Sequence, residues 1–115
     1  MLCRSSAARM LFNAPEVLVG ARDLSGTASI GQDLQVSEVT YLNLLLGRHA
    51  ILFANGMECE SFHPAAAALS HLAEQDRARL AERWPALAGN PRSYGPFARR
   101  RLDPGEAAIL AASAA

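Results

Sequence analysis

The sequence predicts an α+β fold, with antiparallel strands in its first part and helices after them. Three observations carry this prediction. Short apolar runs separated by turn residues fill the chain up to residue 63, a pattern typical of strands. After Pro64 the apolar residues recur at helical spacing. Near the end, Asp103-Pro104-Gly105-Glu106 has the order of a helix N-terminus, with a capping residue, a first-turn proline and a glutamate placed for a capping box.

The first third of the chain contains only short elements. Apolar residues at 10–12 and 17–19 predict two short strands, divided by Asn13, Ala14 and Pro15. Residues 21–24 suit a single helical turn. Residues 25–33 contain two glycines and few large apolar side chains, so we expect a loop or a twisted hairpin there.

The densest strand signal lies between residues 36 and 62. Val39, Tyr41 and the run 44–46 suit a strand, which 47–49 interrupts. Residues 50–54 suit a second strand and 57–62 a third. The Asn55-Gly56 pair between them is the strongest short hairpin signal, because both residues tolerate the positive φ of a type I′ turn. The sequence therefore predicts a three-stranded antiparallel β-meander.

The part of the chain after residue 63 is expected to be helical. Apolar residues from 65 to 87 follow one helical face, Pro85 ends or bends that helix, and Trp84 is its expected core anchor. Residues 90–96 form an irregular connection, and the final helix follows Asp103. We expect one folding unit, with a β portion over 1–63 and a helical extension over 64–115 packed on it.

Composition and charge exclude several classes of partner. Eleven basic residues, all arginine, balance eleven acidic ones, so we expect neither nucleic acid nor a membrane as partner, and Arg99-Arg100-Arg101 is expected to be a solvated run. Abundant alanine and the absence of lysine suggest a bacterial, GC-rich coding sequence. Cys3 and Cys59 have no zinc-ligand spacing, so no metal or cofactor is expected. Without a signal peptide the default location is the cytoplasm, and secretion through a missing upstream segment stays open.

Within this framework, segment 39–62 resembles the late motifs of hedgehog/intein (Hint) domains. In that family a strand leads to a turn with a histidine, matched here by His49, and an Asn-Gly hairpin follows, matched by Asn55-Gly56. The ending Glu60-Ser61-Phe62 is similar to a bacterial Hint subgroup. Segments 15–24, 84–85 and 94–96 also resemble that subgroup, so the resemblance covers about residues 10–110 and points to the C-terminal part of the domain.

The resemblance implies a self-processing chemistry. In Hint domains a Cys or Ser at the first position attacks the preceding peptide carbonyl, and a Thr-x-x-His motif holds that peptide. A late histidine stabilises charge or moves protons, and inteins then release their C-terminal side by asparagine cyclisation. By this resemblance His49 is the catalytic candidate. The supporting turn and strand residues are Asn55, Gly56, Glu60 and Ser61.

The chain also departs from the family pattern. It has no Thr-x-x-His motif, and Arg4-Ser5-Ser6 follow Cys3 in place of the turn expected after a nucleophile. Ser61 stands where inteins carry asparagine. We therefore expect a domain fragment that is inactive alone, whose partner is a missing N-terminal half. The alternative is a non-enzymatic, Hint-derived domain that binds a protein or itself.

Each candidate residue also has an ordinary structural explanation. His49 fits an exposed turn residue that caps a strand as well as a catalytic position. Glu60 could pair with Arg48 or His49, or face solvent. His63 and His71 are expected at the surface or at caps, and Cys59 as a buried structural thiol. No nucleophile–base–acid set of an independent hydrolase is recognisable, and the sequence leaves open whether Met1 is the true start.

Overall fold

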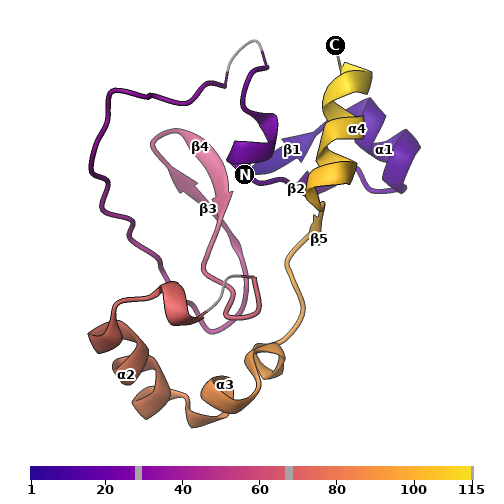
Figure 1. Cartoon of the computed structure of the whole chain (residues 1–115). Coiled ribbons are helices and arrows are strands. Elements are labelled where there is room, and N and C mark those ends of the chain that lie inside the picture. Colours follow the sequence, from indigo (N-terminus) through magenta and orange to yellow (C-terminus); the bar gives the residue numbers. More distant parts are fainter. Residues whose placement is uncertain (28–29, 67–68, 115) are drawn as a thin grey trace. The chain divides into compact units, whose positions relative to one another are not determined.

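The computed structural model of the chain describes residues 1–27, 30–66 and 69–114 and confirms the α+β class (Figure 1). It divides into two compact units. The first is built from Met1–Leu42, Ile51–Glu60 and Ala98–Ala115, and the second from Asn43–Ala50 and Ser61–Phe97. Each unit therefore takes segments from both sides of residue 63.

The first unit contains a small mixed sheet of strands far apart in sequence. Its order is β1 (Leu2–Arg4), β2 (Glu16–Leu18) and β5 (Arg100–Arg101). Strand β1 runs antiparallel to β2, with Cys3 opposite Val17, and β5 runs parallel to β2, with Arg100 also opposite Val17. The strand expected over 17–19 is confirmed as β2, shifted by one residue.

Helices α1 (Ser6–Phe12) and α4 (Pro104–Ala114) and the 3-10 turn η1 (Ala21–Leu24) close the core of this unit (Figure 1). The strand expected over 10–12 is wrong. Ser5 Oγ accepts a hydrogen bond from the Ala8 N–H, and Asn13 ends the helix with φ 52°, which is a complete pair of helix caps. The helical turn expected over 21–24 is confirmed. The buried core residues are Ala8, Val17, Val19, Leu24, Leu102, Ala107 and Leu110.

The N-terminus of α4 is the capping box that the sequence predicts. The Glu106 N–H donates to Asp103 Oδ1 at 2.8 Å, and the Asp103 N–H donates to Glu106 Oε1 at 3.1 Å. Two backbone donors at the helix end are therefore satisfied reciprocally. This local pattern fixes where the last helix begins.

Removing this cap is expected to lower stability measurably. The Asp103→Ala variant loses the acceptor for the Glu106 N–H, at a cost of about 1 kcal/mol in the free energy of unfolding. Asp103→Asn keeps a capping oxygen and is the matched control. Urea unfolding followed by circular dichroism measures both, and equal losses in the two variants would contradict a capping role for Asp103.

The Asn55-Gly56 hairpin is confirmed, but the three-stranded meander is wrong. Strands β3 (Ile51–Ala54) and β4 (Met57–Glu60) pair antiparallel around a turn in which Asn55 has φ 53° and Gly56 φ 76°. Residues 36–46, all of them described, form no strand. Tyr41 is 82% and Leu42 90% exposed. A strand that is apolar on both faces is stable only where other elements pack on both of those faces. No described element buries Tyr41 or Leu42 in this way.

The second unit is mostly helical. It contains η2 (Leu69–His71), α2 (Glu74–Arg83), α3 (Pro85–Gly89) and η3 (Pro91–Tyr94). The expected break at Pro85 is confirmed, since α2 ends before it and α3 begins at it. The expected helical start at 65 is wrong where it is described, because 64–66 form a turn; residues 67–68 lie outside the described residues.

The expected core anchor of these helices is also wrong. Trp84 is 38% exposed, with the Arg83 guanidinium 5.1 Å from the centre of its ring, and Leu87 is the buried residue instead. The break at Pro85 redirects the chain, so residues 84 and 87 do not continue one face of a single helix. Across the described part of the chain, no helix has the length and apolar character that crossing a bilayer requires.

Candidate functional site

Two buried histidines meet in the second unit. His49 precedes β3 and His63 follows β4, and the centres of their rings lie 5.1 Å apart at an interplanar angle of 77°. The Phe97 ring stacks on His63 at 4.0 Å and lies edge-on to His49 at 5.5 Å. Tyr94 lies edge-on to His63 at 5.0 Å. We call these four residues the histidine cluster.

His63 is the centre of this cluster and is held in one orientation. Its Nδ1 accepts a hydrogen bond from the Ala65 N–H at 3.1 Å, and its Nε2 lies 2.8 Å from the Gly95 carbonyl oxygen. Since Nδ1 is an acceptor, the ring proton is on Nε2 and is donated to Gly95. The residue is 2% exposed, so of the two expected positions, surface or cap, the surface is wrong. The hydrogen bond from the Ala65 N–H fits a cap on the turn at 64–66.

His49, the catalytic candidate, is 5% exposed. Its interpretation as an exposed turn residue is therefore wrong, while its catalytic role stays a prediction. Three hydrogen bonds fix the loop that carries it. Ser61 Oγ accepts from the Ala50 N–H at 3.0 Å and the Ser61 N–H donates to the Ala50 carbonyl at 2.8 Å. The Tyr94 hydroxyl donates to the Leu46 carbonyl at 2.6 Å, and burial raises the pKa of Tyr94, so this donor keeps its proton at neutral pH.

The other predicted site residues belong to the first unit. Asn55 and Gly56 form the hairpin turn, and Glu60 ends β4 with its Oε2 3.9 Å from Arg101 Nε. Of the predicted supporting residues, only Ser61 shares a unit with His49. The structural role of Asn55 and Gly56 is therefore to form the turn of the β3–β4 hairpin.

The arginine run is not simply solvated, because each arginine lies beside a different carboxylate. Arg99 pairs with Glu16 of β2 at 2.6 Å, Arg100 with Glu106 of α4 at 2.5 Å and Arg101 with Glu60 of β4 at 3.9 Å. The run thus links a sheet strand, a helix and the hairpin within the first unit. Partly exposed pairs of this kind contribute modestly to stability.

Glu16 is the most connected of these carboxylates. Arg99 donates to its Oε2 and Arg4 Nε to its Oε1, at 2.6 and 2.7 Å. Arg4 also pairs with Glu58 of β4 through its two terminal guanidinium nitrogens, Nη1 and Nη2. The hydrogen bond from Arg99, followed by that from Arg4, holds the pKa of Glu16 below its ordinary value of 4.5.

The lowered pKa of Glu16 predicts an acid-dependent contribution to stability. A carboxyl group whose pKa is lower in the folded chain stabilises that state above the ordinary pKa, and this contribution disappears as the pH falls through the folded pKa. Near neutral pH, the wild-type chain is therefore expected to unfold at a higher urea concentration than the Glu16→Gln variant. The difference should shrink below about pH 4.5 and in high salt. A difference that stays constant from neutral to acidic pH would contradict this assignment.

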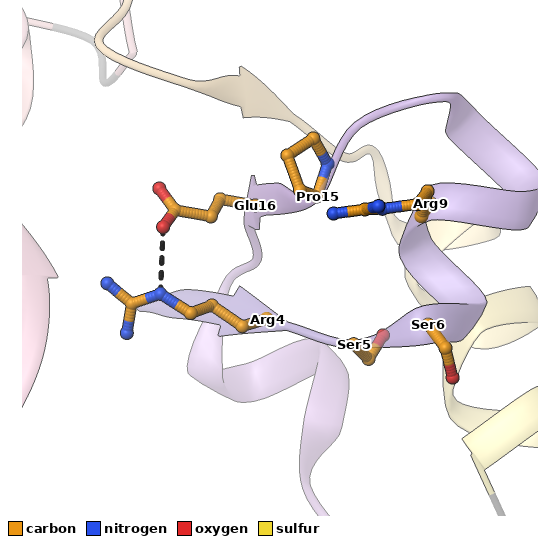
Figure 2. A pocket seen from close by; sticks show the side chains of 6 residues that line it. All are labelled: Arg4, Ser5, Ser6, Arg9, Pro15 and Glu16. Atoms are coloured by element: carbon orange, nitrogen blue, oxygen red, sulfur yellow. Dashed lines mark hydrogen bonds and ion pairs between the residues drawn. The ribbon is translucent and has the colours of Figure 1, made fainter.

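A surface hollow of about 590 Å³ lies beside these pairs, and Figure 2 shows its lining side chains. Arg4 reaches across to Glu16, and Arg9 extends beside Pro15. Ser5 and Ser6 complete the lining. Of these lining residues, Ser5 already caps α1 and Arg4 already holds two carboxylates.

The two cysteines are free thiols within the first unit. Cys3, on β1 opposite the buried Val17, packs against the core, and burial raises its pKa. A thiol of this kind stays protonated and is a weak nucleophile. Cys59 lies half-buried in β4. Among residues 1–27, 30–66 and 69–114 no group of three or more His, Cys, Asp or Glu residues could hold a metal ion.

A model of the Hint domain family matches residues 1–66, more than half of the chain. The chain belongs to the Hint domain family. The match includes every predicted site residue of this Hint domain, and His63 as well; α2, α3 and α4 lie beyond it. No curated protein and no solved structure matches the chain.

Three members of the histidine cluster were missed by sequence reasoning. His63 directly precedes Pro64, and Tyr94 and Phe97 flank Gly95-Pro96. The segment around His63-Pro64 and the segment 94–97 both connect regular elements. Aromatic side chains in such connections often pack against one another. What the sequence does not reveal is that the fold of the second unit brings these two segments to His49.

Proposed function

We propose that this chain is the C-terminal part of a Hint-type self-processing domain, in which His49 moves a proton or stabilises charge at the scissile peptide. In the acyl shift a thiol or hydroxyl attacks the peptide carbonyl carbon, a C–S or C–O bond forms, the C–N bond breaks and the amine takes a proton. A buried imidazole can transfer that proton. The observation that carries the proposal is the burial of His49 on a loop fixed by Ser61 and Tyr94.

We further propose that this chain does not perform the shift alone. The residues three positions before His49, His63 and His71 are Leu46, Glu60 and Ala68, so no Thr-x-x-His motif is present. Cys3 packs against the core with a raised pKa. Ser61, in place of asparagine, has no amide that could cyclise. The partner of the reaction is a segment that supplies the nucleophile and the Thr-x-x-His motif.

Complementation in trans tests this proposal. The purified chain is mixed with the N-terminal half of a bacterial Hint domain that carries both missing elements, and cleavage before the nucleophile is measured by intact-mass spectrometry. The chain alone is expected to keep its mass, and the mixture to release the residues before the nucleophile. His49→Ala should slow this release by about a hundredfold, the lower range for loss of a general acid or base.

His71→Ala is the matched control, because His71 is exposed outside the histidine cluster. Cys3→Ala should also leave the release rate unchanged. Cleavage by the chain alone would contradict the inactive-alone proposal. Equal rates with His49→Ala and His71→Ala would remove His49 from the reaction.

A specific observation favours a second candidate, a non-enzymatic interaction or self-associating domain. Large apolar side chains of segment 39–46 lie exposed: Val39, Tyr41, Leu42, Leu44 and Leu46. A monomeric protein seldom exposes so many large apolar side chains within so short a segment. Under this proposal the chain associates through that run and performs no chemistry.

A further inference from the structure

The residues around the His49 ring come from two separate parts of the sequence. The Hint family match ends at residue 66, and the aromatic residues Tyr94 and Phe97 lie well beyond it. His49, Tyr94 and Phe97 nevertheless all belong to the second unit. Phe97 lies edge-on to His49, with 5.5 Å between the ring centres and an interplanar angle of 89°. The helical extension therefore supplies part of the surroundings of a residue that the family match contains.

Phe97 contacts both histidines of the cluster. Its ring stacks on that of His63 at 4.0 Å and 24°, and the same ring meets His49 at nearly a right angle. The His63 ring is fixed, because hydrogen bonds join its two nitrogens to Ala65 and Gly95. Aromatic rings in contact favour particular relative orientations. The fixed His63 ring thus limits the orientation of Phe97, and Phe97 in turn limits that of His49.

Tyr94 acts on the backbone that precedes His49. Its hydroxyl donates to the carbonyl of Leu46, three residues before the histidine, at 2.6 Å. Its ring lies edge-on to His63 at 5.0 Å. Between the two aromatic residues Gly95 has φ 118°, a backbone angle that glycine adopts without steric cost. The chain around Gly95 places Tyr94 and Phe97 against the same His63 ring.

We propose that Tyr94 and Phe97 are positioning residues for His49 and hold its imidazole in the orientation in which it moves a proton in the acyl shift. The proposal rests on the proposed function, since it concerns the same histidine, and it assigns a role to the helical extension beyond the family match. General acid–base catalysis needs the ring nitrogen within about 2.6–3.2 Å of the atom that gives or takes the proton. An imidazole that rotates loses this alignment.

Simple core packing predicts a different dependence on the two side chains. If Phe97 only fills space, another apolar side chain of similar volume replaces it at small cost, and the reaction does not change. If Tyr94 only stabilises the unit, loss of its hydroxyl lowers the urea midpoint without altering what His49 does. Positioning instead predicts that both substitutions act on the reaction through His49.

Nuclear magnetic resonance of the chain by itself measures the orientation. In the wild type, a magnetisation transfer contact joins the ring protons of His49 and His63, whose ring centres lie 5.1 Å apart. Phe97→Leu should abolish this contact, because the His49 ring then samples several orientations. Phe97→Tyr keeps an aromatic ring and should retain it. Trp84→Leu is the matched control, because Trp84 is 38% and Phe97 37% exposed in the same unit.

Cleavage in trans shows whether the orientation matters to the reaction. With the N-terminal half at saturating concentration, Phe97→Leu and Tyr94→Phe should each slow release about tenfold, less than His49→Ala, because the imidazole is still present. The concentration of the N-terminal half that gives half the maximal rate should not change. Phe97→Tyr should restore the rate. Phe97→Leu added to His49→Ala should slow release no further, since residues that act through one another are not additive.

Two results would overturn the proposal. One is a His49–His63 contact that survives in Phe97→Leu, and the other is a loss of rate that adds fully to that of His49→Ala. Circular dichroism identifies any variant that fails to fold; if Phe97→Leu does, Tyr94→Phe carries both measurements. A wild-type mixture that releases nothing contradicts the acyl-shift proposal instead, and the magnetisation transfer contact then decides by itself whether Phe97 orients His49.

Discussion

Replacing His63 with alanine is expected to destabilise the second unit more than any other single substitution in it. The variant leaves the Gly95 carbonyl and the Ala65 N–H without their partner and removes the ring that Phe97 stacks on at 4.0 Å. Truncation of a buried ring costs about 3–5 kcal/mol, and an unsatisfied buried polar group adds about 1–3 kcal/mol. Domain stability is only about 5–15 kcal/mol, so the variant should lose a large fraction of the stability of this unit.

Fluorescence reports this loss directly, because Trp84 is the only tryptophan and belongs to the second unit. The urea midpoint should be much lower in the His63→Ala variant than in the wild-type chain. In His71→Ala, the exposed control, it should stay near the wild-type value. His63→Gln retains an N–H that can reach toward Gly95 and is expected to fall between them. Equal midpoints for His63→Ala and His71→Ala would mean that His63 does not organise the cluster.

The second large effect is expected at Leu110 of α4. Leu110 is 4% exposed in the core of the first unit, where it joins Val17 and Leu102, whereas its neighbour Ile109 is 53% exposed. Leu110→Ala should lower the free energy of unfolding by about 2–5 kcal/mol, because it removes buried methyl groups and leaves a cavity. Ile109→Ala should change it by less than about 0.5 kcal/mol.

These two substitutions remove apolar groups of equal size from adjacent positions of one helix, so helix propensity does not explain a difference between them. Circular dichroism at increasing urea measures both. A large loss for Leu110→Ala means that α4 completes the core formed by β2 and α1. Similar losses for the two variants would show that α4 does not pack against the sheet.

The parts of the fold that local chemistry determines were predictable. Asn55-Gly56 and the Asp103–Glu106 capping box each satisfy their own backbone within a few residues, and both are confirmed. The break at Pro85 follows from the missing N–H of proline. Such signals do not depend on what the rest of the chain does.

The parts that depend on distant segments were not predictable. Strand β5 has two residues and pairs with β2 more than eighty positions earlier, and so short a strand has no periodicity to detect. The run 39–46 has the composition of a buried strand, but its apolar faces lie exposed. Residues 10–12 suit strand and helix equally, and the caps at Ser5 and Asn13 decide for helix.

The candidate site could likewise be predicted only in part. His49 and Ser61 were found through the family resemblance, and the Hint domain match supports that family. Their neighbours were not found, because His63 looks like an ordinary residue before a proline. Its role depends on Gly95, more than thirty positions away. A histidine that donates to one backbone group and accepts from another is recognisable only when both segments are in place.

We propose that the histidine cluster preforms the late half of a Hint site, with His63 held beside His49. Nitrogen-15 NMR of the imidazole rings at neutral pH tests it most directly in the chain by itself. The prediction is a single Nε2–H tautomer for His63, with slow exchange of that proton with water and a magnetisation transfer contact to the His49 ring. A His63 ring that averages between tautomers and exchanges as fast as His71 would contradict it.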